Sequence, residues 1–286
     1  MADTTLASSE KGTDSAVSVL HAGMSSREKA LQILVPLLAL AAGIGLWQWI
    51  IVANEIPKYI LPGPGDAAVA LFTDSGTLWP ALLVTVRITF MALAVALIGG
   101  VTIAIIIVQS KWLELALFPF TVILQVTPII AIAPLILIYA PDTQSALMIC
   151  AFLVAFFPIL SNMVQGLKSV DHNLLNLFEL YGANSWQTLL FLKIPASMPY
   201  FMAGLRIAGG LSLIAAVVAE FAAGSAGQGA GLAFRLLESQ YRLNLPRLFA
   251  ALIMLCGTGI AIYGLTSFIS WLTLHRWHES AMKREN

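Results

Sequence analysis

The segment RITFMALAVALIGGVTIAIIIVQSK, residues 87–111, has no charged side chain between its first and last residues. A helix needs about 20 apolar residues to cross the hydrocarbon core of a bilayer, and this interval is long enough. Five further intervals have the same property, although one of them contains a single acid, Glu220. Together the six intervals predict membrane-spanning helices at residues 31–53, 81–109, 113–140, 143–167, 197–223 and 248–274.

The composition of the whole chain agrees with a lipid environment. Of its 286 residues, 59% are apolar and only 10% are charged, and the mean hydropathy is +0.87. An average soluble domain has about 25% charged residues, so this chain has too few to cover a water-facing surface. Its formal net charge of zero argues against a nucleic-acid partner, which favours a basic patch. We therefore predict an all-α integral membrane protein with lipid as its surroundings.

The distribution of Lys and Arg predicts the orientation, because cytoplasmic loops retain positive charge. With the N-terminus inside, nine such residues are cytoplasmic and four are external. The cytoplasmic nine are Lys11, Arg27, Lys29, Lys111, Lys168, Lys193, Arg276, Lys283 and Arg284, and the external four are Lys58, Arg235, Arg242 and Arg247. Both termini are therefore expected in the cytoplasm.

The chain divides into four predicted regions. Residues 1–26 lack apolar periodicity and are expected to form a disordered cytoplasmic tail. Residues 27–80 contain the first span and an external loop rich in Pro and Gly, 81–275 form the main transmembrane domain, and 276–286 form a second cytoplasmic tail. Short amphipathic helices are expected outside the membrane at Asp66–Phe72 and Leu232–Tyr241.

A cytoplasmic segment between the fourth and fifth spans has the pattern of two short helices. Asp171 is placed to cap the first helix, and Gly182 to end it, because glycine adopts the left-handed conformation at low cost. Asn184 and Gln187 have the spacing of a capping box at the start of a second helix. Pro195 closes the segment before the fifth span. We call residues Asp171–Pro195 the hairpin.

Two interpretations of the hairpin follow from its pattern alone. Its first helix has an apolar face formed by Leu174, Leu177, Phe178 and Tyr181 at helical spacing. Such a face is suited to docking on a partner protein. It is equally suited to a helix that lies on the membrane surface.

Several motifs resemble the permease subunits of binding-protein-dependent ATP-driven (ABC) importers. The hairpin has Gly182, nine residues, and then Leu-Lys-Ile-Pro at 192–195, where that family has Gly, nine residues, and Ile-x-Leu-Pro. Further similarity to the branch that carries nitrate, sulfonates, taurine, riboflavin or pyrimidine vitamin precursors lies in Leu61–Pro64, Thr127-Pro128, Ala133-Pro134, Pro199–Ala208 and Val217–Phe221. The resemblance covers about residues 55–275.

This resemblance implies a type I ABC importer permease fold in a bacterial plasma (inner) membrane. Two ATPase subunits are implied as partners that bind ATP and Mg²⁺ themselves, so that this chain needs no cofactor. An external binding protein is implied to deliver the small solute, which would be a sulfonate, nitrate, or a vitamin- or pyrimidine-like compound. A second copy of the permease is expected, because a closed two-fold pair is the commonest assembly. The residues implied to couple to the ATPase are Asn176, Glu179, Gly182, Ala183, Asn184, Ser185, Trp186 and Pro195.

The hairpin departs from the family pattern in one place. Asn176-Leu177-Phe178 stands where the family has Glu-Ala-Ala, and in the family that acid faces the ATPase. Glu179 is a possible substitute one turn further along. We therefore expect docking through shape and apolar contact more than through charge.

Four residues within the spans are candidates for the translocation pathway or its gate. Charges inside a bilayer are costly and face a cavity or a partner, which points to Arg87 and Glu220. These two residues are predicted to form an ion pair near the outer surface, or Glu220 is predicted to help gate the outer mouth. Pro128 and Pro134 remove backbone donors from the third span, which either lines a cavity or is simply kinked for packing.

Two other classes of protein are weighed against an importer. A secondary transporter without an ATPase needs no docking hairpin and commonly shows inverted repeats, which we do not find. An enzyme needs clustered catalytic side chains, and the sequence contains no such cluster. Neither catalytic residues nor a metal site are therefore predicted in this chain.

Overall fold

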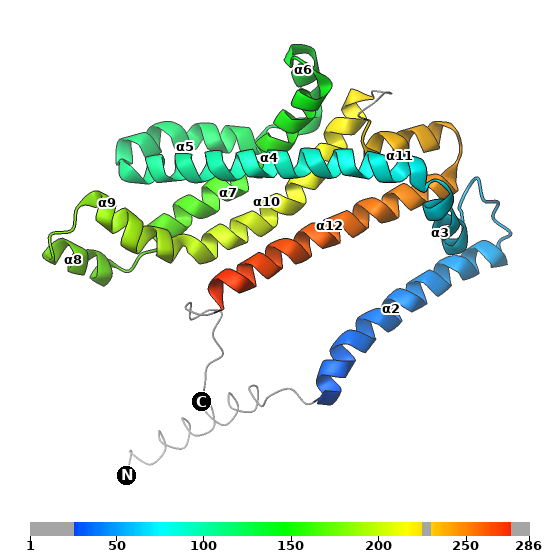
Figure 1. Ribbon diagram of the computed structural model, residues 1–286, viewed down its shortest axis with the longest axis horizontal. Coiled ribbons are helices and arrows are strands. Elements are labelled where there is room, and N and C mark those ends of the chain that lie inside the picture. Colours follow the sequence, from blue (N-terminus) through cyan, green and yellow to red (C-terminus); the bar gives the residue numbers. More distant parts are fainter. Residues whose placement is uncertain (1–25, 225–229, 276–286) are drawn as a thin grey trace, which may run out of the picture. The chain divides into compact units, whose positions relative to one another are not determined.

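The computed structural model describes residues 26–224 and 230–275 of the chain (Figure 1). The predicted tail at 1–26, apart from Ser26, and the predicted tail at 276–286 lie outside the described residues. Contacts divide the chain into two units, one ending at Pro64 and one beginning at Gly65. Each unit is described by itself.

The described part of the first unit is built on α2 (Ser26–Ala53). Its portion Leu34–Ala53 is long and apolar enough to span a membrane, and none of it is buried inside the protein. Exposed side chains such as Leu38 and Trp49 therefore suit contact with lipid. The helix ends in a turn in which the Asn54 side chain donates to the Ile50 carbonyl over 2.8 Å and Glu55 adopts a positive φ of 49°.

The second unit is entirely helical over its described residues. Its elements are α3 (Pro64–Thr73), α4 (Ser75–Gln109), α5 (Lys111–Val126), α6 (Ile129–Tyr139), α7 (Thr143–Lys168), α8 (His172–Leu180), α9 (Ser185–Thr188), the π-helical turn η1 (Leu189–Lys193), α10 (Ile194–Ala223), α11 (Leu232–Tyr241) and α12 (Leu245–Leu274).

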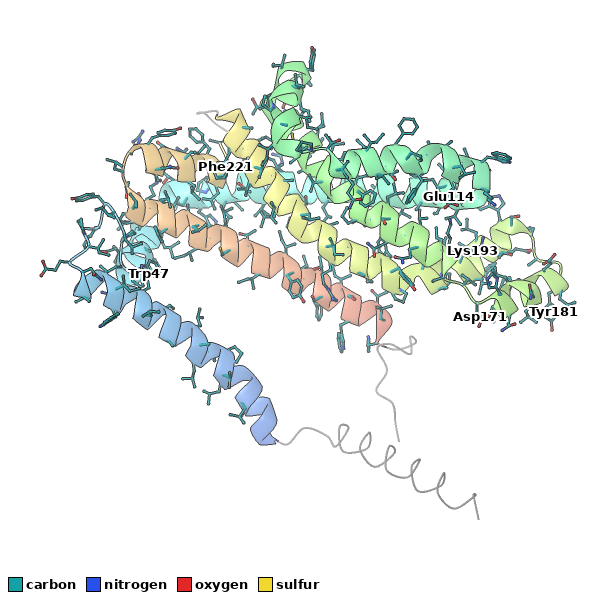
Figure 2. The ribbon with its side chains drawn as sticks, turned by 180° about the vertical axis from the view of Figure 1, so that it is seen from behind. Trp47, Glu114, Asp171, Tyr181, Lys193 and Phe221 are labelled. Carbon is teal, nitrogen blue, oxygen red and sulfur yellow. The ribbon has the colours of Figure 1, made fainter. Side chains whose placement is uncertain are left out.

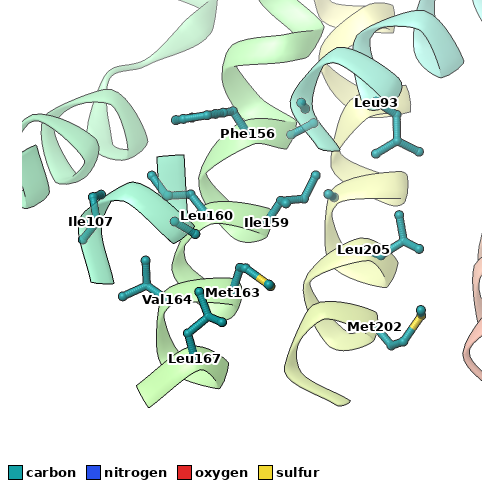
Figure 3. Close-up of a cluster of buried hydrophobic side chains, with 14 of the residues drawn as sticks. Leu93, Ile107, Phe156, Ile159, Leu160, Met163, Val164, Leu167, Met202 and Leu205 are labelled. Carbon is teal, nitrogen blue, oxygen red and sulfur yellow. The ribbon is translucent and has the colours of Figure 1, made fainter. Parts of the chain in front are cut away.

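The core of this unit lies between α4, α7 and α10. Figure 3 shows Leu93 of α4, Ile159 and Leu160 of α7, and Leu205 of α10 in one buried cluster. The three helices present one apolar face to each other, and the opposite faces carry large exposed apolar side chains such as Ile98 and Ile214. A protein that is apolar inside and outside is expected when its outer surface contacts lipid.

Small residues allow the core helices to approach closely. At Gly100, an added Cβ would lie 2.8 Å from Cγ2 of Ile159, and at Gly204 it would lie 2.9 Å from the Pro158 carbonyl oxygen. Close contact at small residues is a main source of helix association in membranes, where hydrophobic burial gives no net drive. These glycines therefore bring α4 and α10 against α7.

The third predicted span is not one continuous helix, and the prediction for residues 113–140 was wrong in this respect. The chain forms α5 and α6 with a bend of 99° between them. Pro128 has no N–H to continue the helical ladder, and it forces the preceding Thr127 into an extended conformation, with φ −68° and ψ 122°. The Thr127 amide still donates to the Ile123 carbonyl over 3.1 Å, and the Thr127 hydroxyl donates to the same oxygen over 2.6 Å.

The other predicted spans are confirmed, with shifts at their ends. Among the described residues, five helices are long and apolar enough to cross a membrane, and the bent pair α5–α6 would make a sixth span. The largest shift is at α4, which begins at Ser75 and therefore includes Pro80, whereas the loop was predicted to continue to residue 80. Both predicted amphipathic helices are present, as α3 and α11.

The second unit has two ends with different features. Figure 1 shows α8 and α9 at one end of α7 and α10, and α11 at the other end of α10. We call them the hairpin end and the α11 end. At the hairpin end, an ion pair between Lys168 and Glu114 joins the end of α7 to the start of α5.

The glycine contacts lead to a first prediction. Gly204→Ala would press a methyl group against the Pro158 carbonyl and the Asn162 Cβ, and overpacking of this kind costs about 1–3 kcal/mol. Gly210→Ala lies on the same helix with nothing within 4 Å, so it should gain helix propensity of up to about 1 kcal/mol. Thermal unfolding in detergent should show a lower midpoint for Gly204→Ala than for Gly210→Ala. Equal midpoints would contradict the close packing of α10 on α7.

Candidate functional site

The turn of the hairpin is fixed by backbone geometry. The Asp171 carboxylate accepts from the Asn173 amide over 2.7 Å and caps α8. At the other end of α8, Gly182 adopts a left-handed φ of +71°. Its amide donates to the Glu179 carbonyl, and the Ala183 amide donates to the Phe178 carbonyl, both over 2.9 Å. This pair of bonds is a Schellman motif, which confirms the predicted helix stop.

The second arm of the hairpin starts with a complete capping box. The Asn184 side chain accepts from the Gln187 amide, and the Gln187 side chain accepts from the Asn184 amide, both over 2.8 Å. The predicted cap is therefore confirmed. Pro195 was predicted to close the hairpin before the fifth span, and this is wrong, because the chain is helical without interruption from Ser185 to Ala223. Pro195 lies in the first turn of α10, directly after the π-helical turn η1.

The hairpin exposes an apolar surface. Leu180 is 83% exposed, Tyr181 82% and Trp186 68%. A hollow of about 400 Å³ lies between the two arms. It is lined by Leu177, Phe178, Tyr181, Ala183, Gln187 and Phe191. Figure 2 shows Asp171, Tyr181 and Lys193 together at the hairpin end. Large exposed apolar patches of this kind indicate a partner or a membrane surface.

The predicted coupling residues come together in this hairpin. Asn176 and Glu179 lie on α8, Gly182 and Ala183 in the turn, and Asn184, Ser185 and Trp186 at the start of α9. All of these are exposed except Ala183, which is half-buried, as is Pro195. The site is therefore one contiguous surface about a rigid turn.

A second polar feature lies at the α11 end, around Glu220 of α10. This side chain is only 2% exposed. One carboxylate oxygen accepts from the Thr85 hydroxyl of α4 over 2.7 Å, and the other accepts from the Ala233 amide of α11 over 2.9 Å. Thr85 in turn accepts from the Leu232 amide over 2.8 Å. We call these four residues the Glu220 joint.

The predicted ion pair between Arg87 and Glu220 is not formed. Arg87 lies two positions after Thr85 on α4, about 200° around a helix with 3.6 residues per turn, so it points away from Glu220. It is exposed and lines a hollow of about 220 Å³ together with Asp142, Gln144 and Ser145. Hydrogen bonds from the Ser145 backbone and hydroxyl lower the pKa of the Asp142 carboxyl, which keeps a negative charge in this hollow.

The two candidate prolines have different positions. Pro128 lies at the bend between α5 and α6, and Pro134 lies inside α6. Both are exposed on the part of the chain that the structure describes. The structure does not bring either of them into the Glu220 joint.

Several residues of the Glu220 joint were missed by the sequence analysis. Thr85 resembles any threonine in an apolar run, and the contributions of Leu232 and Ala233 come from backbone amides. Carboxylates are favoured at helix N-termini. A charged Glu220 within an apolar span, shortly before the predicted start of α11, was therefore the one feature of the sequence that could have indicated this contact. A separate cluster about Glu238 was also missed. Glu238 pairs with Arg235 and Arg242, each over 2.9 Å, and lies 3.9 Å from Arg247.

A comparison with known protein families decides the class of the chain. The family described as "Binding-protein-dependent transport system inner membrane component" matches residues 96–283, which is more than half of the chain. The chain belongs to this family. It is thus a permease-family membrane protein with several spans, in agreement with the resemblance found in the hairpin.

Individual relatives of this permease support the same class. A probable ABC transporter permease protein of Haemophilus influenzae is 29% identical over 86% of this chain and 98% of its own. The riboflavin transport system permease protein of Chloroflexus aurantiacus is 33% identical over 82% of this chain and 86% of its own. The formylaminopyrimidine transport permease protein of Halalkalibacterium halodurans is 31% identical over 74% of this chain and 84% of its own.

A solved structure shows that the fold is shared. A chain from the crystal structure of an amino acid ABC transporter with histidines matches this permease with a TM-score of 0.60 and 16% identity. The match covers 73% of this chain and 98% of the other. At this identity the likeness concerns the fold alone. Within the described residues, no group of three or more His, Cys, Asp or Glu is placed to hold a metal ion.

The Glu238 cluster leads to a prediction about pH. The hydrogen bond from Arg235, together with the charges of Arg235, Arg242 and Arg247, lowers the pKa of the Glu238 carboxyl below its usual 4.5. A carboxyl with a lowered pKa in the folded state stabilises the protein above its unfolded pKa, and this stabilisation is lost as the pH falls through the lowered value. The thermal midpoint of the wild type should therefore fall between about pH 5 and pH 3.

The matched variant is Glu238→Gln, which keeps the size of the side chain and removes its charge. Its midpoint should be lower than that of the wild type at pH 7 and should decline less on acidification. A decline as steep as that of the wild type would assign the acid sensitivity to other carboxyl groups.

Proposed function

We propose that this chain is the membrane-spanning permease subunit of an ATP-driven importer that receives a small solute from an external binding protein. The observation that carries the proposal is the hairpin, a capped and rigid element with an exposed apolar surface, in a chain of the binding-protein-dependent permease family. A secondary transporter would have no use for such an element. The activity that follows from this proposal is transport, and the chain itself would catalyse no reaction.

The hairpin is proposed to dock on an ATPase subunit at the cytoplasmic side. The exposed Leu180, Tyr181 and Trp186 would enter a groove on that subunit, and the helix caps and the capping box would keep the hairpin rigid when the ATPase moves. Gly182 and Asn184 thus have a positioning role, whereas Asn176 and Glu179 would lie at the edge of the contact. ATP and Mg²⁺ would bind to the two ATPase subunits, and this chain would hold no cofactor.

The orientation and assembly follow from the same proposal. If the hairpin end faces the cytoplasm, the α11 end faces the external binding protein, and both termini lie inside a bacterial plasma membrane. Two copies of the permease are proposed to form the pathway, because a two-fold pair presents two hairpins to two ATPase subunits.

Arg87, Pro128 and Pro134 are proposed to line the pathway. An exposed arginine in a span faces water or a partner and avoids lipid, and Arg87 lies in a hollow with Gln144 and Ser145. The bend at Pro128 leaves non-helical backbone, which persists at membrane depth only beside protein or water. Glu220 would contribute to the external end of the pathway by holding α11, without pairing with Arg87.

The solute is proposed to be small and polar. Relatives are named for the transport of riboflavin, formylaminopyrimidine, bicarbonate and nitrate. A vitamin- or pyrimidine-like compound, nitrate or a sulfonate fits this range. Arg87 and Asp142, which line one hollow, would offer a passing polar solute contacts of both charge signs.

The docking proposal is tested by a pair of aromatic substitutions. Tyr181 in the hairpin is 82% exposed and Tyr241 at the end of α11 is 83% exposed, so neither supports the core. Tyr181→Asp should reduce co-purification of the ATPase subunit by about tenfold or more, as expected for the loss of a central aromatic contact. Tyr241→Asp should leave it unchanged. If both variants retain the ATPase equally, the hairpin is not the docking element.

The apolar character of the contact predicts weak dependence on salt. Asn176 is neutral, and charge contacts between exposed groups are screened over about 8 Å at physiological ionic strength. Affinity for the ATPase should therefore change by less than about threefold between low and high salt, because an apolar contact is not screened. The variant Asn176→Glu should introduce a salt-dependent component. A steep salt dependence in the wild type would show that docking relies on charge.

A further inference from the structure

The Glu220 joint connects three helices at the α11 end. Glu220 belongs to α10, Thr85 to α4, and the two amides at Leu232 and Ala233 to the first turn of α11. The joint is sealed, because Thr85 and Leu232 are fully buried and a side chain at Gly231 would collide with the Glu220 carboxylate. Breaking one of these bonds would leave a buried acceptor or donor without a partner, which is costly.

The same helix reaches the hairpin at its other end. α10 has 30 residues and so is about 45 Å long at 1.5 Å per residue. Its first residue follows η1 directly, and the helical chain continues back to Ser185 at the start of α9. Figure 2 shows Lys193 at the hairpin end and Phe221, the neighbour of Glu220, at the α11 end. One uninterrupted element therefore joins the hairpin to the Glu220 joint.

A second set of contacts fixes the far end of α11. Glu238 of α11 lies 3.9 Å from Arg247 of α12, and Arg247 donates to Thr77 of α4 over 3.0 Å. At the start of α11, Leu232 and Ala233 are fully buried, and in its middle Leu236 packs on the cluster formed with α3, α4 and α12. Since α11 is held along its whole length, it cannot shift without moving the helices beneath it.

We propose that the Glu220 joint couples α11 to the hairpin through α10, so that events at the ATPase and at the external face change each other. Glu220 and Thr85 are positioning residues in this scheme, because they act through α10 and α11 and touch no solute. The inference rests on the proposed function, in which the hairpin docks on an ATPase. Such coupling is reciprocal, so that binding at either end has the same energetic effect on the other.

The test uses ATP and vanadate as the probe of the ATPase end and a fluorophore on α11 as the probe of the other. The full complex with its co-purified ATPase is reconstituted, with Cys256→Ser to remove the exposed thiol and Tyr241→Cys to attach bimane at a position that is 83% exposed. The emission of bimane is compared before and after vanadate traps the nucleotide. The amplitude is expressed per trapped nucleotide.

Matched substitutions separate coupling from folding. Thr85→Val removes the hydroxyl while keeping the volume, and Thr85→Ser keeps the hydroxyl. Thr266→Val is the control, because Thr266 is 4% exposed and its hydroxyl bonds only to carbonyls of its own helix, at Ile262 and Tyr263. Glu220→Ala removes the carboxylate itself.

The wild type, Thr85→Ser and Thr266→Val should show the change in emission on trapping. In Thr85→Val and Glu220→Ala, the amplitude of this change in emission should be smaller by a factor of about five or more, which is the lower end of the usual range of allosteric coupling. Retention of the amplitude in both variants would overturn the inference, as would a wild type that traps nucleotide without any change at α11. A wild-type complex that traps no nucleotide would instead contradict the proposed function.

Discussion

Hydrocarbon offers no hydrogen-bond partner to a polypeptide backbone, and this constraint underlies every feature of the structure. Backbone N–H and C=O groups at membrane depth must be satisfied within the chain, so the spans are helices. Where Pro128 ends the helical ladder, the last carbonyl before the bend that still has its amide donor, that of Ile123, also accepts from the Thr127 hydroxyl. Where an acid is buried at Glu220, a hydroxyl and a backbone amide meet its two oxygens. The polar groups of the buried acid are therefore satisfied by other groups of the same chain.

The same constraint explains why small residues, rather than large apolar ones, bring the helices together. Leu and Ile are as well solvated by lipid as by protein, so burying them gives little drive for association. Gly100 and Gly204 allow α4 and α10 to lie directly against α7. Close backbone approach then supplies the van der Waals contact that holds the three helices together.

The caps and turns of the hairpin were predictable because they depend on neighbours in the sequence. Asp171, Gly182 and Asn184 form the predicted cap, stop and capping box. The bounds of α11 also agree with the prediction, Leu232–Tyr241. By contrast, the predictions of a continuous span at 113–140 and of a hairpin that closes at Pro195 were wrong. Charge-free length alone does not distinguish a proline at which the chain bends, Pro128, from a proline over which the helix continues, Pro195.

The sequence by itself determined the lipid surroundings, the number of spans when the bent pair α5–α6 is counted as one, and the caps and turn of the hairpin. These follow from composition, charge-free length and short-range capping. Only the tertiary structure decided the partners of the buried acid. Glu220 bonds to Thr85, 135 positions away in the chain, and to a backbone amide, while Arg87 faces another side of α4. Every residue type except proline supplies the same backbone amide, so the sequence does not show which amide will bind the acid. Which residues face each other depends on how the helices pack. The joint between α4, α10 and α11 is therefore a property of the fold.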